Sequence, residues 1–408
     1  MLDIDAIRSL TPGVEHVAHL NNCGSSLPSR PVVDAMVDYL RAEELNGGYE
    51  TAADRSEDLD RFYPATASLL SCSPDEVAFC SGAAEAWWRA FSSVPLSAGD
   101  RILVNSGEYQ ANAFGWMQAR DRGVEVDLIA NDDFGIVDLD ALEAMIDERV
   151  KLVSFTMISL GNGAIQPAAA AAERVRSAGS DAIFLLDACQ AAGQLSLDVR
   201  ELGCDFLIYT GRKFMRGPRG TGALFARADV LDRLGPPIFV DGRSAVWTED
   251  NSYRPVPGAG RFEFGEFNFA GKVGLGVATD YAVELGLDAI AARVASLADQ
   301  LREQLSSIDG VTVHDEGIER CGIVTFTIAG VESATVAAEL RDRSINVSVP
   351  QRAAAQLDLG ARGLASVVRC GVHYFNTNDE LDRLCDAVET VQLEPPCKLK
   401  HGERADNQ

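Results

Sequence analysis

The sequence predicts an α/β fold, in which a mostly parallel seven-stranded sheet forms a large domain and a smaller C-terminal α+β domain follows. Short apolar runs alternate with amphipathic helical patterns through the middle of the chain, which favours this class. The seven predicted strands are Val77–Cys80, Arg101–Val104, Val124–Ile129, Leu152–Thr156, Ile183–Asp187, Phe206–Thr210 and Gly222–Ala226. Because ligands bind beyond the carboxyl ends of such strands, we expect the functional site at that edge.

Helical patterns separate most of these strands, as at Asp138–Ile146 and Ala170–Ala178. Beyond residue 268, Gly271–Leu285 is expected to be a helix that leads into the small domain. That domain is predicted to contain strand Ile323–Ile328, helix Ala334–Arg343, strands Asn346–Val349 and Ser366–Val372, and a final helix opened by Thr377. The expected divisions are an N-terminal segment contributing to the site (1–30), a large domain (31–275), a small domain (276–394) and a flexible tail (395–408).

The composition narrows the classes of function. The 408 residues are 47% hydrophobic and carry a net charge of −25, so we expect neither nucleic acid nor membrane as a partner. No run approaches the roughly 18–20 apolar residues of a membrane span, and the N-terminus lacks a signal-peptide pattern. A cytoplasmic address is therefore predicted. The nine cysteines form no CxxC pair and the five histidines do not cluster with them, which predicts no metal site.

Two charged residues follow buried strands at the predicted ligand edge. Asp187 ends one apolar strand, where a carboxylate either reaches a ligand or caps a helix. Lys213 lies 26 residues later (213 − 187) in a glycine-rich loop that also holds three arginines. A lysine amine whose pKa is lowered forms a Schiff base with a carbonyl group, whereas a lysine in a basic loop is otherwise a solvated charge.

A third motif is Ser81-Gly82-Ala83-Ala84-Glu85-Ala86, in which a strand passes through small residues into a helix. Backbone N–H groups at such a helix start bind phosphate, although many strand–helix turns look similar. Alone the motif is weak. The motif becomes informative because it is followed along the chain by Asp187, Gln190 and Lys213, so that the motifs form an ordered set.

Together these motifs resemble fold-type I pyridoxal-5′-phosphate (PLP) enzymes of the class V aminotransferase superfamily. The stretch Arg261–Asn268 (RFEFGEFN) and Arg369 followed by His373–Thr377 extend the resemblance, which covers Leu20 to about Val391. The resemblance implies PLP as the cofactor. It also implies a homodimer, because sites of this fold type are usually completed by a second subunit.

By this resemblance, Lys213 holds PLP as a Schiff base and moves protons at the substrate Cα, and Asp187 keeps the pyridine nitrogen protonated. Gln190 is expected to bond the ring 3-oxygen. The other expected cofactor contacts are Gly82, Ala83, Ala84, Tyr109, Thr210 and Arg212, and the expected substrate contacts are Asn22, Cys23 and Arg369. Arg369 is expected to bind the substrate carboxylate as a bidentate fork.

The sequence departs from the desulfurase pattern of this superfamily at several positions. Tyr109 stands where a ring-stacking histidine is usual, Ala84 replaces a phosphate-turn threonine, and Glu266 replaces a threonine of the neighbouring subunit. The loop 346–355, before Arg369, lacks the cysteine that attacks the substrate sulfur in desulfurases. The absence of this loop cysteine predicts that the protein is not a persulfide-forming cysteine desulfurase.

Similarity to the branch around hercynylcysteine sulfoxide lyase, isopenicillin N epimerase-like and lincosamide-pathway enzymes is found in segments 47–53 (GGYETAA), 107–112 (GEYQAN), 212–222, 345–349 and 357–369. This resemblance predicts a PLP-dependent lyase that eliminates the C–S bond of a cysteine S-conjugate in secondary-metabolite, notably antibiotic, biosynthesis. Two alternatives stay open. One is decarboxylation with oxidative deamination, or epimerisation at Cα, of a similar amino acid; the other is a PLP-binding scaffold without turnover.

Overall fold

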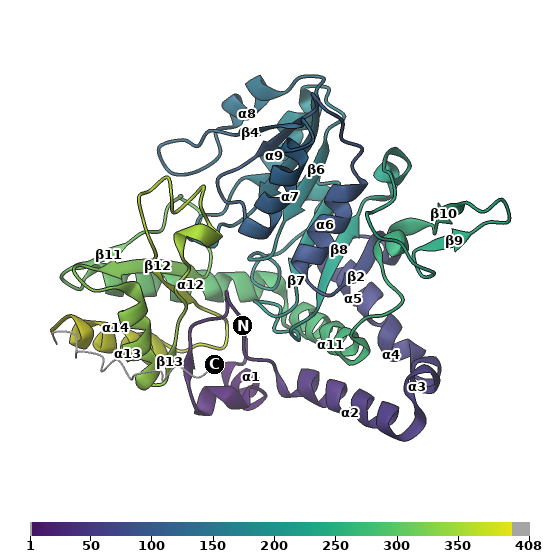
Figure 1. Ribbon diagram of the computed structural model, residues 1–408. Helices are drawn as coiled ribbons and strands as arrows, with labels where there is room; N and C mark the ends of the chain where they lie inside the picture. Colours follow the sequence, from purple (N-terminus) through teal and green to yellow (C-terminus); the bar gives the residue numbers. More distant parts are fainter. Residues whose placement is uncertain (1, 394–408) are drawn as a thin grey trace, which may run out of the picture.

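A seven-stranded sheet forms the centre of the computed structural model, which describes residues 2–393 (Figure 1). Its strands are β2 (Val77–Cys80), β3 (Arg101–Val104), β4 (Glu125–Leu128), β5 (Val150–Thr156), β6 (Ile183–Asp187), β7 (Phe206–Thr210) and β8 (Gly222–Ala226). They lie in the order β2-β8-β7-β6-β5-β3-β4; β8 runs antiparallel to its neighbours β7 and β2, and the other pairs are parallel. The predicted fold class is confirmed.

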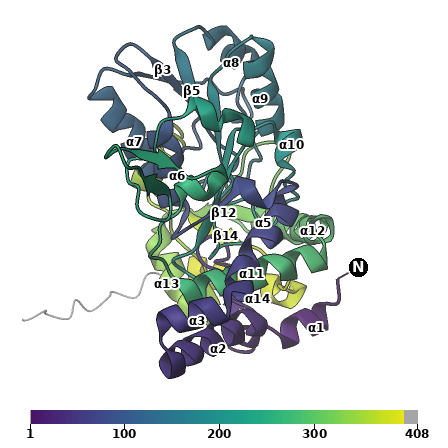
Figure 2. The ribbon, with the colours of Figure 1, turned by 90° about the vertical axis from the view of Figure 1, so that its right-hand side faces the viewer.

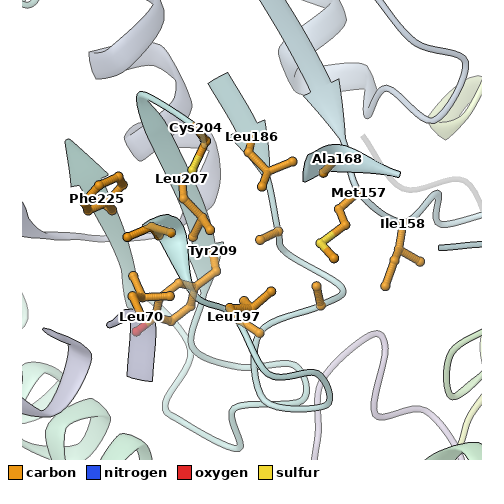
Figure 3. Close-up of a cluster of buried hydrophobic side chains, with 14 of the residues drawn as sticks. Leu70, Met157, Ile158, Ala168, Leu186, Leu197, Cys204, Leu207, Tyr209 and Phe225 are labelled. Carbon is orange, nitrogen blue, oxygen red and sulfur yellow. The ribbon is translucent and has the colours of Figure 1, made fainter. Parts of the chain in front are cut away.

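Both faces of the sheet are covered at strands β6, β7 and β8, which explains why these strands are mostly apolar, whereas the edge strand β4 carries the exposed Glu125. Successive side chains of a strand point to opposite faces. In β7, Phe206 and Ile208 pack with helix α6 (Ala83–Ser93), whereas Leu207 and Tyr209 belong to the cluster on the opposite face. Figure 3 shows that second cluster, in which side chains of β6, β7 and β8 meet Leu70 of helix α5 (Phe62–Leu70).

Helices surround this sheet and connect its strands. The remaining helices of this part of the chain are α2 (Arg30–Asn46), α3 (Gly48–Asp54), α4 (Ser56–Asp60), α7 (Gln110–Arg120), α8 (Leu139–Met145), α9 (Ala168–Ser177), α10 (Val199–Leu202) and α11 (Phe269–Leu285). Helix α11 packs against α2 and α5, and Figure 2 shows α2 and α11 at the same end of the molecule. Among residues 2–393, no helix is long and apolar enough to cross a membrane.

The C-terminal part is built on a three-stranded antiparallel sheet in the order β11-β12-β14. Its elements are α12 (Leu287–Ser306), β11 (Val311–Val313), β12 (Ile323–Ile328), α13 (Ser333–Asp342), β13 (Ile345–Asn346), β14 (Val368–Gly371) and α14 (Asn378–Leu393). The strand predicted at 346–349 ends at Asn346 instead. Beyond it, Ser348 and Arg369 exchange backbone hydrogen bonds, which draws this segment towards β14. The domain limits stay predictions, and the tail at 395–408 lies outside the described residues.

The N-terminal segment is tied to the small domain. Strand β1 (Ala18–His19) pairs in parallel with β13, and Asn21 forms a bridge with Gly371 of β14. The backbone N–H of Ser26 then donates to the carbonyl of Arg212, beside the predicted cofactor lysine. This path brings residues 23 and 24 to the carboxyl edge of the large sheet.

Candidate active site

A cavity of about 450 Å³ lies where the large sheet, the small domain and the N-terminal segment meet. All the residues predicted to bind cofactor or substrate line this cavity, with the exception of Asn22. The motifs at the ends of β2, β6 and β7 contribute Gly82, Asp187 and Lys213, while the small domain contributes Arg369. Residues far apart in the sequence therefore meet at the carboxyl edge of the large sheet, where the site was expected.

Asn22 points into the protein instead. Its side chain is fully buried, donates to the carbonyls of Gly371 (2.7 Å) and His19 (3.0 Å), and accepts from the Ser26 hydroxyl (2.7 Å). Those bonds hold the N-terminal segment against β14. In this arrangement Asn22 supports the site through the backbone of its neighbours and does not itself line the cavity.

Asp187 presents its carboxylate to the cavity from the end of β6. Its Oδ1 accepts from the backbone N–H of Cys189 (2.9 Å), and its Oδ2 accepts from the side-chain amide of Asn112 (2.9 Å). The alternative role of helix cap is not seen, because the next helix, α10, begins at Val199 and is capped by Asp198. The side chain is 7% exposed, so its charge acts in a largely water-free environment.

Lys213 follows β7 in the loop that leads to β8. Burial lowers the pKa of its amine below the ordinary value, against the opposing effects of Cys189 and Asp187, and the cations Arg212 and Arg369 lower it further. A lysine with a lowered pKa has more of the neutral amine that attacks a carbonyl carbon. The position therefore fits the predicted Schiff-base lysine.

The loop that carries Lys213 is fixed by side chains whose role the sequence did not reveal. Arg216 adopts a left-handed conformation (φ 57°) and donates to the Leu27 carbonyl (2.9 Å), the Tyr374 hydroxyl (2.9 Å) and the Thr11 hydroxyl (2.7 Å). His373 donates from Nε2 to the carbonyl of Phe214 (2.9 Å). These bonds fix the loop, and the loop in turn holds the Lys213 amine at the cavity.

Replacing Arg216 by methionine should lower the free energy of unfolding by about 3 kcal/mol, because three acceptors lose a charged and buried donor. Urea unfolding of the cofactor-free protein followed by circular dichroism measures this change. Arg219, which is exposed in the same loop, provides the matched control, and Arg219→Met should alter stability by less than about 0.5 kcal/mol. Equal effects of the two substitutions would contradict the anchoring role.

The expected phosphate site lies at the start of helix α6. Gly82 precedes the helix, and the Ala83 and Ala84 backbones line the cavity. Strand β8 packs closely behind this turn, since a Cβ on Gly222 would lie 3.0 Å from the Gly82 Cα. Arg212 also lines the cavity, although its guanidinium donates here to the Gly24 carbonyl. Glu266 is exposed and does not line the cavity.

Two further polar side chains, those of Arg369 and Gln190, complete the lining of the cavity. Arg369 is 8% exposed, and its guanidinium donates to the Ser348 hydroxyl (3.1 Å) and to the Leu160 carbonyl (3.2 Å). Gln190 is 4% exposed, and its Oε1 has no hydrogen-bond partner among the described residues. A buried polar atom without a partner is costly, so this oxygen indicates that a ligand with a polar group belongs in the cavity.

PLP fits these residues. A helix start for its phosphate, a carboxylate for its ring nitrogen and an amine of lowered pKa for its aldehyde surround one cavity. The mostly parallel sheet places them as fold-type I enzymes do. The fold and site therefore define a PLP-dependent enzyme of fold type I.

Comparison with known proteins gives the family: residues 18–384 match the model of aminotransferase class V, and the chain belongs to that family. A probable cysteine desulfurase of Methanothermobacter thermautotrophicus is 29% identical, covering 92% of this chain and 95% of its own. A cysteine desulfurase of Synechococcus elongatus is 30% identical over 91% of this chain, which spans 60% of that longer protein. The apo structure of a cysteine desulfurase from Thermococcus onnurineus superposes with a TM-score of 0.88 and 26% identity, covering 96% and 99% of the two chains.

These relatives correct the predicted reaction. The predictions of a lyase for cysteine S-conjugates, of decarboxylation or epimerisation, and of a role in secondary-metabolite or antibiotic biosynthesis are wrong, because the similar proteins are named cysteine desulfurases. The exclusion of desulfurase activity is wrong for the same reason. It rested on one loop, yet Cys23 and Cys189 bring two other thiols to the cavity wall. The resemblance to the branch around hercynylcysteine sulfoxide lyase stays a prediction, because only membership of the aminotransferase class V family is shown.

Proposed function

We propose that the protein removes the sulfur atom of L-cysteine and releases L-alanine. One observation carries the proposal: the cavity joins a lysine of lowered pKa, a buried carboxylate and a buried arginine in a chain similar to cysteine desulfurases over nine-tenths of its length. Cysteine needs these three groups. The amine moves the Cα proton, the carboxylate faces the cofactor ring, and the guanidinium binds the substrate carboxylate.

The cofactor, when bound, supplies an electron sink for charge that develops on the substrate carbons. Lys213 takes the proton from Cα, and Arg369 holds the carboxylate so that the sulfur-bearing side chain stays inside the cavity. The Cβ–Sγ bond then breaks as a thiol takes the sulfur atom. The bonding pair stays on carbon and is protonated. L-cysteine and a thiol R–SH thus give L-alanine and the persulfide R–S–SH, which balances atoms and electrons.

The accepting thiol in this proposal enters the cavity from solution. Residues 346–355 supply no cysteine, and Cys23 is fully buried. Cys189 is half-buried, but burial raises the pKa of its thiol well above the ordinary value and the nearby Asp187 raises it further. The thiolate is the nucleophilic form, so a thiol that stays protonated at neutral pH is a poor acceptor. A small thiol in solution is not buried, so its pKa is not raised in this way.

The test incubates PLP-loaded protein with L-cysteine and dithiothreitol, which serves as acceptor and releases sulfide. We expect L-alanine and sulfide in equal amounts, measured by amino-acid analysis and a sulfide assay. Pyruvate and ammonia in place of alanine would refute the proposed reaction. The variant Cys189→Ser should keep most of the alanine formation. If it retains PLP but forms no alanine, Cys189 is the acceptor and the external-thiol step is wrong.

The predicted homodimer belongs to the same proposal. The hairpin of β9 (Ala245–Trp247) and β10 (Tyr253–Pro255) projects from the large domain (Figure 1), and Trp247 on it is 79% exposed. Large exposed aromatic side chains on a projecting element are typical of subunit contacts. The cytoplasmic address also stays a prediction.

A further inference from the structure

A second buried carboxylate lies behind Asp187. Glu108 is 2% exposed and lies between β3 and helix α7, just beyond the cavity wall. Its Oε1 accepts from the Asn112 amide (2.8 Å), and the same amide nitrogen donates to Asp187 Oδ2 (2.9 Å). One side-chain amide thus bridges two carboxylates, and only the second of them faces the cavity.

Strand β5 holds Glu108 firmly in this position. Its Oε2 accepts from the Ser154 hydroxyl (2.7 Å), and its Oε1 accepts in addition from the Thr156 hydroxyl (3.1 Å). The Ser154 hydroxyl accepts in turn from the Trp87 indole N–H (3.3 Å). Glu108 precedes Tyr109, the N-cap of α7, and Asn112 lies in the first turn of that helix, so the start of α7 brings the Asn112 amide between Glu108 and Asp187.

The bridge determines how the Asp187 carboxylate can rotate. Oδ1 is held by the Cys189 backbone N–H, and Asn112 is the side-chain donor recorded for Oδ2 in the described part of the chain. If Asn112 turned away, Oδ2 would lose that donor. Asn112 is itself held by Glu108, since both of its recorded bonds use the same amide nitrogen, one to each carboxylate.

We propose that Glu108 is a positioning residue: through the Asn112 amide it fixes the orientation of Asp187 and thereby strengthens the hold of the site on the pyridine ring of PLP. The inference concerns cofactor binding. It is independent of which amino acid is turned over and of which thiol accepts sulfur.

The charge of Glu108 also contributes. Burial raises the pKa of Glu108 to about 7, the three side-chain donors oppose this, and the neighbouring Asp187 carboxylate adds to the rise. Of the groups packed on Glu108, those from α6, α7 and β5 are uncharged (Trp87, Asn112, Ser154 and Thr156), and Asp187 of β6 is the charged one. Its ionised form therefore adds negative charge behind Asp187, which favours a protonated ring nitrogen.

The central experiment compares wild type with Glu108→Gln, which keeps the size of the side chain and removes the charge. We expect PLP to bind roughly tenfold more weakly, as measured by fluorescence titration of the cofactor-free protein, because a charge-assisted bond is replaced by a neutral one. The visible absorbance of bound PLP should also titrate at lower pH, by about 1 unit, since negative charge near the ring is removed. Binding within twofold of wild type together with an unchanged titration would overturn the proposal.

The chain offers a matched control. Glu380 is another buried glutamate that accepts from an asparagine amide, that of Asn376 (2.7 Å), and this pair lies in the C-terminal part of the chain, away from Asp187. Glu380→Gln should lower the thermal stability but leave the PLP affinity and the absorbance titration unchanged. If Glu380→Gln changes both cofactor readouts as Glu108→Gln does, the effect is a general loss of stability and the proposal is wrong.

Two further variants test the relay, and the single substitution of Ser154 keeps the test decisive if Glu108→Gln does not fold. Asn112→Leu removes the bridge itself, and its effect on PLP affinity should not add to that of Glu108→Gln in the double variant. Ser154→Ala removes only one bond to Glu108 and should weaken PLP binding by about threefold. Full additivity of the first pair, or no change in the serine variant, would contradict a relay from Glu108 through Asn112.

Discussion

Replacing Lys213 by alanine should abolish alanine formation from cysteine, with a loss of about 10⁴-fold or more, and should remove the visible absorbance of the Schiff base. The expected loss has the upper size of general acid–base effects, and the covalent hold on PLP disappears with the same amine. The lowered pKa of this lysine gives the physical basis, because burial in the cavity favours its neutral form. Steady-state kinetics and an absorbance spectrum of the PLP-incubated variant measure both losses.

A second buried lysine, Lys272, is the alternative amine for a Schiff base with PLP. Lys272 is 2% exposed, and burial lowers the pKa of its amine to about 8. Its Nζ donates to the Tyr63 hydroxyl (2.7 Å), and it does not line the active-site cavity. Borohydride reduction followed by peptide mass spectrometry should therefore find the pyridoxyl group on Lys213 alone. A label on Lys272, or absorbance that persists in Lys213→Ala, would contradict the assignment of Lys213 as the Schiff-base lysine.

The fold could be predicted because its strands are short and apolar on both faces. The observed limits of β6 and β7 agree with those predicted, since buried parallel strands stand out from the amphipathic helices between them. Strand β13 shows where local pattern fails. Residues 347–349 look like strand, but β1 offers only two residues for pairing, and the bonds between Ser348 and Arg369 decide the path instead.

The convergence of the site could also be predicted, since parallel strands bring their carboxyl ends to one edge and each motif follows such an end. The positions of supporting residues could not. Asn22 was expected at the substrate, yet its amide bonds two backbone carbonyls, and only the folded N-terminal segment reveals them. The spacing Glu108–Asn112 was visible in the sequence, but nothing in it shows that Asp187, 75 residues beyond Asn112 (187 − 112), completes the bridge.

The reaction was the least predictable part. The absence of a loop cysteine was interpreted as the absence of desulfurase chemistry, but sulfur transfer needs a thiol near the substrate and not a particular loop position. The cavity wall includes Cys23 and Cys189, but the first is fully buried and burial raises the pKa of the second, so the proposed acceptor is a thiol from solution. Similarity along the whole chain is the stronger guide here, because it covers the positions predicted to bind the amino acid and the cofactor.

The second large effect is expected from Asp187→Asn, which keeps the shape of the side chain and removes its charge. A neutral amide cannot stabilise a protonated ring nitrogen as a carboxylate does, and losing a preorganised electrostatic group of this kind costs roughly 10³-fold in kcat. PLP should still bind through Lys213 and the start of α6, although at least about tenfold more weakly, so at saturating PLP the loss should appear in kcat while the bound cofactor remains visible in the spectrum.

A matched carboxylate separates this effect from damage to the fold. Asp205 is fully buried just before β7, at the opposite edge of the sheet, where it accepts from the Phe184 backbone N–H (2.8 Å) and pairs with Arg176 (3.0 Å). Asp205→Asn should lower the thermal midpoint and leave kcat of the folded enzyme within about twofold, because no part of it faces the cavity. If Asp187→Asn also keeps kcat within that range while holding PLP, the carboxylate at the end of β6 does not act on the ring, and the site must bind its cofactor in another way.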